Sequence, residues 1–294
     1  MDALKAPPKA TKLPMQRMLS THLIANHRLT TAWLNKVEQA GVEAVEIFCA
    51  LQHFDYRNKS QVAELGHWFR DSALKLHSLH SPMYTDNIWG RTGPHTHVNI
   101  TELTKGLRIQ WVDEIKRALE VAEIVPFRYL IQHLGAGGQE FSEYAIEAGF
   151  RSLEELAVFA RQLGVEILLE NTPNELSTAE RLMHFNRMTH LNLNFVFDTG
   201  HAHIGAGVAN EFDIMKERIR SLHVHDNDGT EDSHLYPKAE GGTIDWTAAM
   251  QLFRSKPNQF PLLLELREVP EDENPLARVA RTFDTIEALE PTHD

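Results

Sequence analysis

The chain has 294 residues, with 29 basic and 41 acidic side chains, 17 histidines, one cysteine and a formal net charge of −12. A chain of this length buries about three quarters of its unfolded surface and needs no disulfides to be stable. One cysteine excludes a disulfide framework and a thiolate zinc site, and the acidic balance gives no electrostatic footprint for nucleic acid. Many histidines with almost no cysteine favour a metal site built from imidazoles and oxygens.

The N-terminal residues carry no recognisable targeting signal. Residues 1–15 are basic and rich in proline, and no apolar segment follows them, so we expect a disordered N-terminal tail rather than a signal peptide. The apolar runs elsewhere, such as residues 262–264, are too short to span a bilayer. The sequence therefore predicts a cytoplasmic protein without a membrane partner, in which residues 16–294 form a single domain.

Eight short segments rich in β-forming residues recur along the chain, and amphipathic stretches separate them. The expected strands are 18–24, 42–48, 74–80, 128–133, 166–170, 194–198, 219–225 and 261–265. The expected helices are 30–38, 60–69, 107–119, 152–164, 178–187, 209–217, 246–255 and 275–289. The fourth helix is placed by the capping-box spacing of Ser152 and Glu155. Alternating strands and helices imply a parallel sheet, and eight such units in this length predict an α/β fold of the (β/α)8 TIM-barrel type.

The main alternative fold is a doubly wound open sheet with a glycine-rich phosphate loop. No G-x-G-x-x-G motif follows the first expected strand, so the barrel is the better prediction. One connection is unusually long, from residue 81 to residue 103, and it contains Trp89. Loops of this length are most often functional.

Polar side chains stand at the ends of most expected strands. Catalytic groups in a barrel come from the C-terminal ends of the strands. Because side chains alternate between the two faces of a strand, these polar residues share a face with the apolar residues two positions before them, which we expect to point into the barrel. Six of the eight expected strands end in a side chain that can bind a metal: His80, His133, Glu170, Asp198, His225 and Glu265. One such histidine alone is more often a hydrogen-bonded core or surface residue, but six together predict a common site.

Three of these six side chains are carboxylates, which repel one another and raise one another's pKa when they are brought close together. A divalent cation relieves that repulsion, and carboxylate and imidazole ligands suit Mn²⁺, Mg²⁺, Co²⁺ or Zn²⁺. We therefore expect a divalent metal and no organic cofactor.

Further residues extend the set of expected ligands. His201 follows Asp198 by three positions, and Asp232 and His234 form an Asp-x-His pair just after the seventh strand. His223 shares the parity of His225, and we expect it to hold a ligand in place.

The same residues lie in blocks with a characteristic order. They are LHSP (79–82), QHLG (132–135), LENT (169–172), DTGH (198–201), HVHDNDG (223–229), DSHL (232–235), GGTIDW (241–246) and LE (264–265). In these blocks the chain resembles the xylose isomerase-like TIM-barrel superfamily. That group includes sugar isomerases and epimerases, inosose dehydratase-type enzymes and the endonuclease IV class of abasic-site nucleases. The resemblance runs from the first expected strand to near Glu265.

Resemblance to the sugar enzymes implies one divalent metal and proton transfer next to a metal-bound carbonyl. The implied metal ligands are Glu170, Asp198, His225 and Glu265. Glu170 and Glu265 are also the implied catalytic residues, one removing a proton from carbon and the other returning it. The substrate implied is a small sugar or polyol, with His201 contacting a hydroxyl, and barrels of this superfamily often form homo-oligomers.

The nuclease class is the main functional alternative, because its nine ligands for three zinc ions all have counterparts here. Besides the four ligands above, these are His80, His133, His201, Asp232 and His234, which we expect to bind further metal or substrate. The nuclease block carries a cysteine where this chain has Gly200, and the chain lacks basic recognition loops. We therefore expect no nucleic-acid partner. A metal-dependent dehydratase, a hydrolase or decarboxylase on the same site, and a binding protein with a degenerate site are the remaining alternatives.

The chain also departs from the ketohexose epimerases. The arginine that these enzymes carry six residues after the metal histidine is replaced by Glu231. The glutamate six residues after their first ligand glutamate is replaced by Leu176, with Glu175 one position short. These differences argue against a simple free hexose as substrate.

Overall fold

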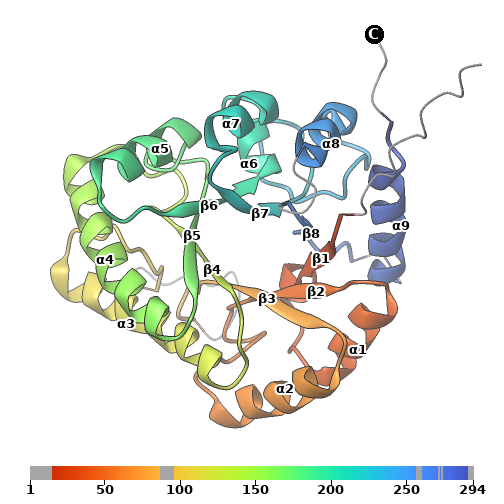
Figure 1. Cartoon of the computed structure of the whole chain (residues 1–294), viewed down its shortest axis with the longest axis horizontal. Coiled ribbons are helices and arrows are strands. Elements are labelled where there is room, and N and C mark those ends of the chain that lie inside the picture. The colour runs from red at the N-terminus through yellow and green to blue at the C-terminus, as the bar shows by residue number, and fades with distance from the viewer. Residues whose placement is uncertain (1–14, 87–95, 256–259, 271, 273, 291–294) are drawn as a thin grey trace, which may run out of the picture.

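The computed structural model describes residues 15–86, 96–255, 260–270, 272 and 274–290, in which eight parallel strands form a barrel inside a ring of helices (Figure 1). The strands are β1 (Arg17–Ser20), β2 (Ala44–Phe48), β3 (Lys75–His80), β4 (Tyr129–His133), β5 (Glu166–Glu170), β6 (Asn194–Asp198), β7 (Ile219–His223) and β8 (Leu262–Leu264). Neighbouring strands pair in the order β7-β6-β5-β4-β3-β2-β1-β8. A parallel bridge between Val224 and Leu264 joins the two ends, so the predicted TIM barrel is confirmed.

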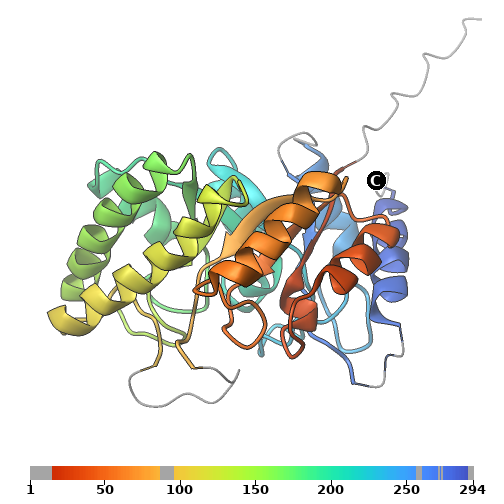
Figure 2. The same cartoon turned by 90° about the horizontal axis from the view of Figure 1, so that it is seen from below.

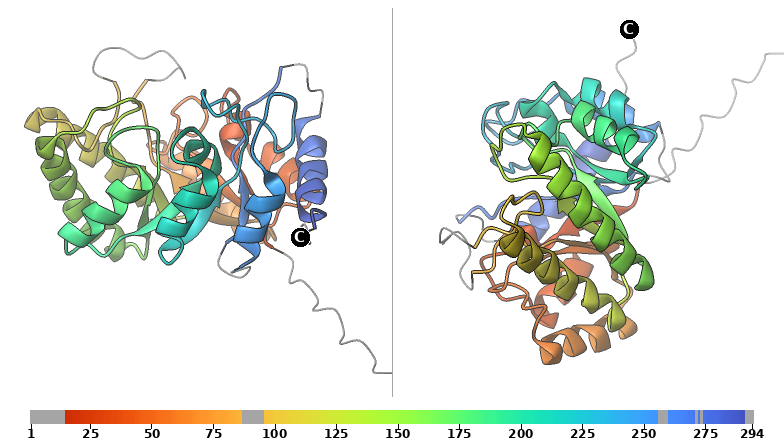
Figure 3. Two further views of the ribbon diagram at one scale, coloured as in Figure 1. Left: turned by 90° about the horizontal axis from the view of Figure 1, so that it is seen from above. Right: turned by 90° about the vertical axis from the view of Figure 1, so that its left-hand side faces the viewer.

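The helices follow the strands and cover the outside of the barrel. They are α1 (Thr31–Gln39), α2 (Lys59–Asp71), α3 (Lys105–Leu119), α4 (Glu143–Gln162), α5 (Ala179–Met188), α6 (Thr199–Ile204), α7 (Val208–Met215), α8 (Trp246–Arg254) and α9 (Pro275–Glu287). Figure 2 shows this layer from the side, and Figure 3 shows α3 and α4 packed side by side. None of the helices in the described ranges is both long and apolar enough to cross a membrane.

The alternation of side chains along the strands separates two apolar regions. The outward-facing residues pack under the helices in one large buried cluster. The inward-facing residues form two small clusters inside the barrel: Tyr129, Ile131, Leu168 and Val196 in one, and Met18, Ala44 and Leu263 in the other. This parity agrees with the sequence analysis, and it directs the strand-end polar groups into the barrel mouth.

The most informative differences from the sequence-based expectation concern the first strand, the fourth helix and the helix α6. The first strand ends at Ser20, because Ser20 Oγ accepts a hydrogen bond from the His22 amide and a 3-10 helix, η1 (Thr21–Ile24), begins there. The fourth helix begins at Glu143, capped by Ser142, and not at the expected capping box. Ser152 lies inside that helix and is buried, and its hydroxyl donates to the Ile100 and Ala148 carbonyls at 2.8 and 2.9 Å. The short helix α6 was not expected.

Two expectations lie largely outside the described residues. Residues 1–14 of the proposed tail at 1–15 lie outside the described residues, whereas Met15 is described and buried. Residues 87–95 of the long connection, which include Trp89, also lie outside the described residues.

Candidate metal centre

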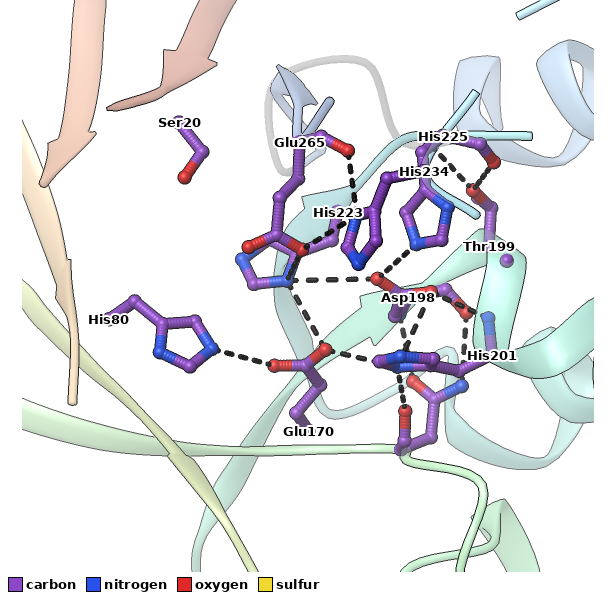
Figure 4. Close-up of polar contacts among 12 residues, drawn as sticks. Ser20, His80, Glu170, Asp198, Thr199, His201, His223, His225, His234 and Glu265 are labelled. Carbon is purple, nitrogen blue, oxygen red and sulfur yellow. Dashed lines mark hydrogen bonds and ion pairs between the residues drawn. The ribbon is translucent and has the colours of Figure 1, made fainter. Parts of the chain in front are cut away.

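Four buried polar side chains converge at the C-terminal ends of neighbouring strands β5, β6, β7 and β8 (Figure 4). Glu170 ends β5, Asp198 ends β6, His223 ends β7, and Glu265 directly follows β8. Their potential ligand atoms all lie within 4.8 Å of one another. We call these four residues the central group.

His223 occupies the middle of the central group. Its Nδ1 lies 3.3 Å from Glu170 Oε1, 3.2 Å from Glu265 Oε2 and 3.8 Å from Asp198 Oδ2. Its other nitrogen, Nε2, lies 3.2 Å from Oε1 of Glu46, a fully buried residue of β2. The sequence analysis did not identify Glu46. In the sequence, Glu46 could be noticed as the single charged residue of an otherwise apolar strand. It lies on the same inward-facing side of the strand as Ala44 and Phe48.

A second group consists of Glu170 with His80 and His133, which stand at the ends of β3 and β4. His133 Nε2 lies 3.1 Å from Glu170 Oε2, and His80 Nε2 lies 3.6 Å from the same oxygen. The three residues could hold an ion together, as the sequence analysis expected for the two histidines.

A third group consists of Asp198, His201, His225, Asp232 and His234. Asp232 and His234 come from the loop that follows β7. Asp232 Oδ2 lies 3.3 Å from His201 Nε2 and 3.2 Å from His234 Nε2, and His225 Nε2 lies 3.0 Å from Asp198 Oδ2. His201 is brought here by α6, whose first turn Asp198 caps by accepting a hydrogen bond from the His201 amide at 2.7 Å. The structure thus gathers all nine expected site residues at one mouth.

One placement differs from the motif-based assignment. The motif gives His225 as the imidazole that completes the set of Glu170, Asp198 and Glu265. In the structure His225 groups with Asp198 and His201 and with Asp232 and His234, whereas His223 groups with the three carboxylates.

Asp226 fixes the loop that carries Asp232 and His234. Its buried carboxylate accepts hydrogen bonds from Trp246 Nε1 at 2.6 Å and from the Ile244 amide at 3.1 Å. It also accepts one from the Lys238 amide at 3.2 Å. The Asp226 carboxylate therefore ties the C-terminal end of the loop to its start.

The residues at which the chain departs from the ketohexose epimerases do not enter the site. Leu176 is fully buried in the main apolar cluster, and Glu231 is exposed. The Glu175 carboxylate accepts a hydrogen bond from the Phe141 amide at 2.8 Å, so it does not replace the missing glutamate.

Gly200 leaves room for the His225 ring. A Cβ at position 200 would lie 2.0 Å from His225 Cε1 and 2.5 Å from Nδ1. A cysteine at this position, which the nuclease motif carries, is therefore incompatible with the observed position of His225.

Gly200→Ala is expected to displace His225 and to lower the free energy of unfolding by about 1–3 kcal/mol, as overpacking of a rigid core does. Urea unfolding measures this. Gly137→Ala is the matched control, because a Cβ at position 137 meets nothing within 4 Å. Equal stability of the two variants would contradict the observed packing.

Electrostatics hold the central carboxyl groups in the ionised form. Burial alone would raise the pKa of Glu170, but the nearby imidazoles of His223 and His133 outweigh it, and the pKa lies well below its ordinary value. Burial would also raise the pKa of Glu265, but His223 and His234 outweigh it, and this pKa too lies well below its ordinary value. The pKa of His223 lies well above its ordinary value, because Glu265, Glu46 and Glu170 outweigh the effect of burial.

His234 gives a pH-dependent prediction. Burial alone would lower the pKa of His234, but the hydrogen bond and the charge of Asp232 outweigh burial and raise this pKa to about 9. A raised folded-state pKa stabilises the protein fully below the unfolded value of about 6.5, and this contribution is lost as the pH rises through about 9. The contribution of His234 to the stability of metal-free protein should therefore fall by about 3 kcal/mol between pH 6.5 and 9. Affinity for a cation should rise over the same range, because protons no longer compete.

Urea unfolding of chelator-treated protein at the two pH values tests this, with His234→Gln as the comparison. The variant should show a smaller change. A stability that increases from pH 6.5 to 9 would contradict the assignment.

The chemistry of the donors fits a divalent cation. Buried polar groups normally have hydrogen-bond partners, yet His223 Nδ1, His225 Nδ1 and Asp232 Oδ1 are buried and make no hydrogen bond of good geometry. His223 Nδ1 instead faces the carboxylates of Glu170 and Glu265 at 3.3 and 3.2 Å. Each of these atoms is a potential metal ligand, and each belongs to a residue of the groups above. Oxygen and imidazole donors with no thiolate match the metals that the sequence analysis expected.

Comparison with known proteins agrees with this architecture. The model of the family described as xylose isomerase-like TIM barrel matches residues 34–289. An uncharacterized protein of Methanocaldococcus jannaschii is 26% identical over 233 residues, which are 75% of this chain and 73% of that protein. An uncharacterized protein of Sinorhizobium fredii is 24% identical over 213 residues, which are 66% and 67% of the two chains.

Solved structures with the same fold include sugar epimerases. A D-tagatose 3-epimerase-like protein superposes with a TM-score of 0.72 at 20% identity, covering 93% of this chain and 97% of that one. The 3-keto-D-glucoside 4-epimerase of E. coli gives a TM-score of 0.70 at 14% identity, covering 92% and 99%. A D-allulose 3-epimerase from Methylomonas sp. gives 0.68 at 16% identity, covering 95% and 98%.

Proposed function

Because the chain belongs to the xylose isomerase-like TIM-barrel family, we propose that it is a divalent-metal-dependent isomerase or epimerase of a sugar or polyol. The observation that carries the proposal is the central group, in which three buried carboxylates surround one imidazole at the barrel mouth. Structural neighbours that are named sugar epimerases support the same substrate class. We place the enzyme in cytoplasmic sugar metabolism.

The proposed metal ligands are Glu170, Asp198 and Glu265 together with one imidazole from the end of β7. The motif assigns this imidazole to His225, and the geometry offers His223 as well. A divalent cation bound there would act as a Lewis acid that polarises a substrate carbonyl and acidifies the adjacent C–H bond.

Glu170 and Glu265 are the proposed proton carriers. They project from β5 and from the end of β8, and their pKa values well below the ordinary range leave both carboxylates able to accept a proton at neutral pH. In the proposed step, one of these carboxylates removes the proton from the carbon next to the carbonyl and becomes protonated. The other must first take up a proton from solvent, and it then delivers that proton to carbon. His201 contacts Glu170 Oε1 at 3.1 Å, so it is placed to meet a substrate hydroxyl beside the reacting carbon.

The second and third groups support one further candidate, a zinc phosphodiesterase similar to endonuclease IV. Glu170 with His80 and His133 forms one potential ion site, and Asp232 with His225 and His234 forms another. Several adjacent cations suit the attacking and leaving oxygens of a phosphodiester. The nuclease motif carries a cysteine at position 200, and its side chain would clash with the His225 ring as it lies here. This difference argues against the nuclease candidate.

Turnover of a substrate panel separates the two candidates. Metal-loaded protein is incubated with ketohexoses, 3-keto-glucosides and their phosphate esters, and in parallel with an abasic-site duplex at physiological salt. We expect a stereochemical or positional change in one sugar class, seen by NMR, and no strand cleavage. Efficient duplex cleavage without sugar turnover would replace the proposal by the second candidate.

A further inference from the structure

Two polar side chains, Asn171 and Thr199, join the ends of strands β5, β6 and β7, and neither has a role in the proposed function. Asn171 directly follows Glu170, and Thr199 directly follows Asp198. We infer that both are positioning residues, each of which holds the backbone of the next metal ligand along the barrel. Asn171 holds Asp198, and Thr199 holds His225, so we call the two residues the clamps. The inference rests on the proposed function, because it concerns the ligands of the same metal.

The hydrogen-bonded pairing between these strands stops before it reaches the ligands. The pairs between β5 and β6 end with Glu170 and Val196, so Asp198 lies two positions beyond the last pair. The pairs between β6 and β7 end with Asp198 and His223, so His225 also lies two positions beyond the last pair. Asp198 and His225 are fully buried, and buried backbone N–H and C=O groups need partners. Other groups must therefore bind the backbone of these two residues.

The side-chain amide of Asn171 takes the place of a neighbouring strand for Asp198. Asn171 Oδ1 accepts a hydrogen bond from the Asp198 amide at 2.8 Å, and Asn171 Nδ2 donates to the Asp198 carbonyl at 3.0 Å. Asn171 Nδ2 also donates to Oε2 of Glu211, a buried residue of α7, at 3.3 Å. The backbone carbonyl of Asn171 lies 2.9 Å from His201 Nδ1. Asn171 is thus fixed by α7 and itself fixes two residues of the site.

The hydroxyl of Thr199 binds His225 in the same way. Thr199 Oγ1 accepts a hydrogen bond from the His225 amide at 3.1 Å and donates to the His225 carbonyl at 2.8 Å (Figure 4). The adjacent carbonyl of Gly200 accepts a hydrogen bond from Nδ2 of Asn227, a buried residue that follows His225 by two positions, at 2.9 Å. Side chains therefore join the end of β6 and the segment after β7 in both directions.

The two clamps act in series across the barrel mouth. Each clamp follows one ligand and binds the backbone of the next, so the spacing of Glu170, Asp198 and His225 is set from strand to strand. Ligands of a functional metal have to be held within about 0.5 Å of their working positions, and neighbouring hydrogen bonds supply that precision. The clamps therefore arrange the ligands before an ion binds.

Metal affinity tests the two clamps without reference to turnover. Co²⁺ is bound to each folded variant, its affinity is measured by chelator competition, and its visible absorption reports the arrangement of its ligands. We expect Asn171→Ala and Thr199→Val each to weaken binding about 10–100-fold, as loss of a group that orients a ligand does, and to change the absorption spectrum. Thr199→Ser, which keeps the hydroxyl, should bind Co²⁺ as the wild type does.

Two buried side chains that belong to none of the potential metal groups among the described residues give matched controls. Asn186 Oδ1 accepts a hydrogen bond from the Leu193 amide at 2.9 Å, and Thr282 Oγ1 donates to the Arg278 carbonyl at 2.9 Å. Asn186→Ala and Thr282→Val therefore also remove a buried hydrogen bond and lower stability, but they should keep the wild-type affinity and spectrum. Circular dichroism and urea unfolding establish that each variant is folded and how much stability it has lost.

Each clamp is judged by its own variant. Wild-type affinity and spectrum in Asn171→Ala or in Thr199→Val would overturn the inference for that clamp and leave the proposed function intact. The same loss of affinity in the matched control would also overturn it, because the loss would then follow from lower stability alone. A wild-type protein that binds no divalent cation would overturn both the inference and the proposed function.

Discussion

Removal of divalent metal is expected to abolish turnover and to lower the melting temperature by about 5–10 °C. A ligand that binds only the folded protein, present at 100 times its Kd, contributes about 2.7 kcal/mol, and a domain of this size gains a few degrees per kcal/mol. Without the cation, the mutual repulsion of the buried Glu170 and Glu265 carboxylates is offset by the nearby imidazoles alone. Thermal unfolding and activity after exhaustive chelation measure both effects.

Restoration by added metal is the control for this experiment. Mn²⁺, Mg²⁺, Co²⁺ and Zn²⁺ are returned one at a time, and the one that restores both melting temperature and turnover identifies the working ion. Chelated protein that keeps full activity and full thermal stability, with no metal found by elemental analysis, would contradict the metal proposal.

Glu170→Gln and Glu265→Gln are expected to lower kcat by about 10³-fold or more. Each substitution removes a group proposed to transfer a proton, a role that contributes about 10²–10⁴-fold, and also a metal ligand. Steady-state kinetics at saturating metal, with elemental analysis of each variant, separates loss of the proton carrier from loss of the ion.

Glu175→Gln is the matched control, since its carboxylate binds the Phe141 amide and does not belong to the metal groups found among the described residues. Its kcat should stay within about twofold of wild type, as expected for a change away from the reacting groups. Turnover by Glu170→Gln or Glu265→Gln at the wild-type rate would exclude that glutamate as a proton carrier.

The barrel could be predicted from sequence because its signals are local. Each strand shows its own alternation, and the last inward residue of a strand must lie at the mouth, which is why Glu170 and Asp198 were identified. The helix α6 was missed because residues 199–204 have no apolar period. The hydrogen bond that the His201 amide donates to the Asp198 carboxylate at the start of this helix is visible only in the structure. Ser152 fits a capping pattern, yet its hydroxyl is buried against Ile100.

The sequence does not show that His223 lies nearer than His225 to the three carboxylates of the central group. The two residues share the same parity, and only their depth in the barrel and the space beside Gly200 distinguish them. Glu46 gives no sign of its partner either, because 177 positions separate it from His223. The contact joins side chains of β2 and β7, which are not paired in the sheet and approach each other only inside the closed barrel.

Solvent isotope incorporation tests proton transfer at the carboxylates most directly. Metal-loaded protein turns over its sugar substrate in deuterium oxide, and mass spectrometry with NMR locates the label. Exchange through Glu170 and Glu265 predicts one deuterium at a single carbon next to the carbonyl of the product. A product formed without any deuterium at carbon would contradict it and indicate hydride transfer or another reaction.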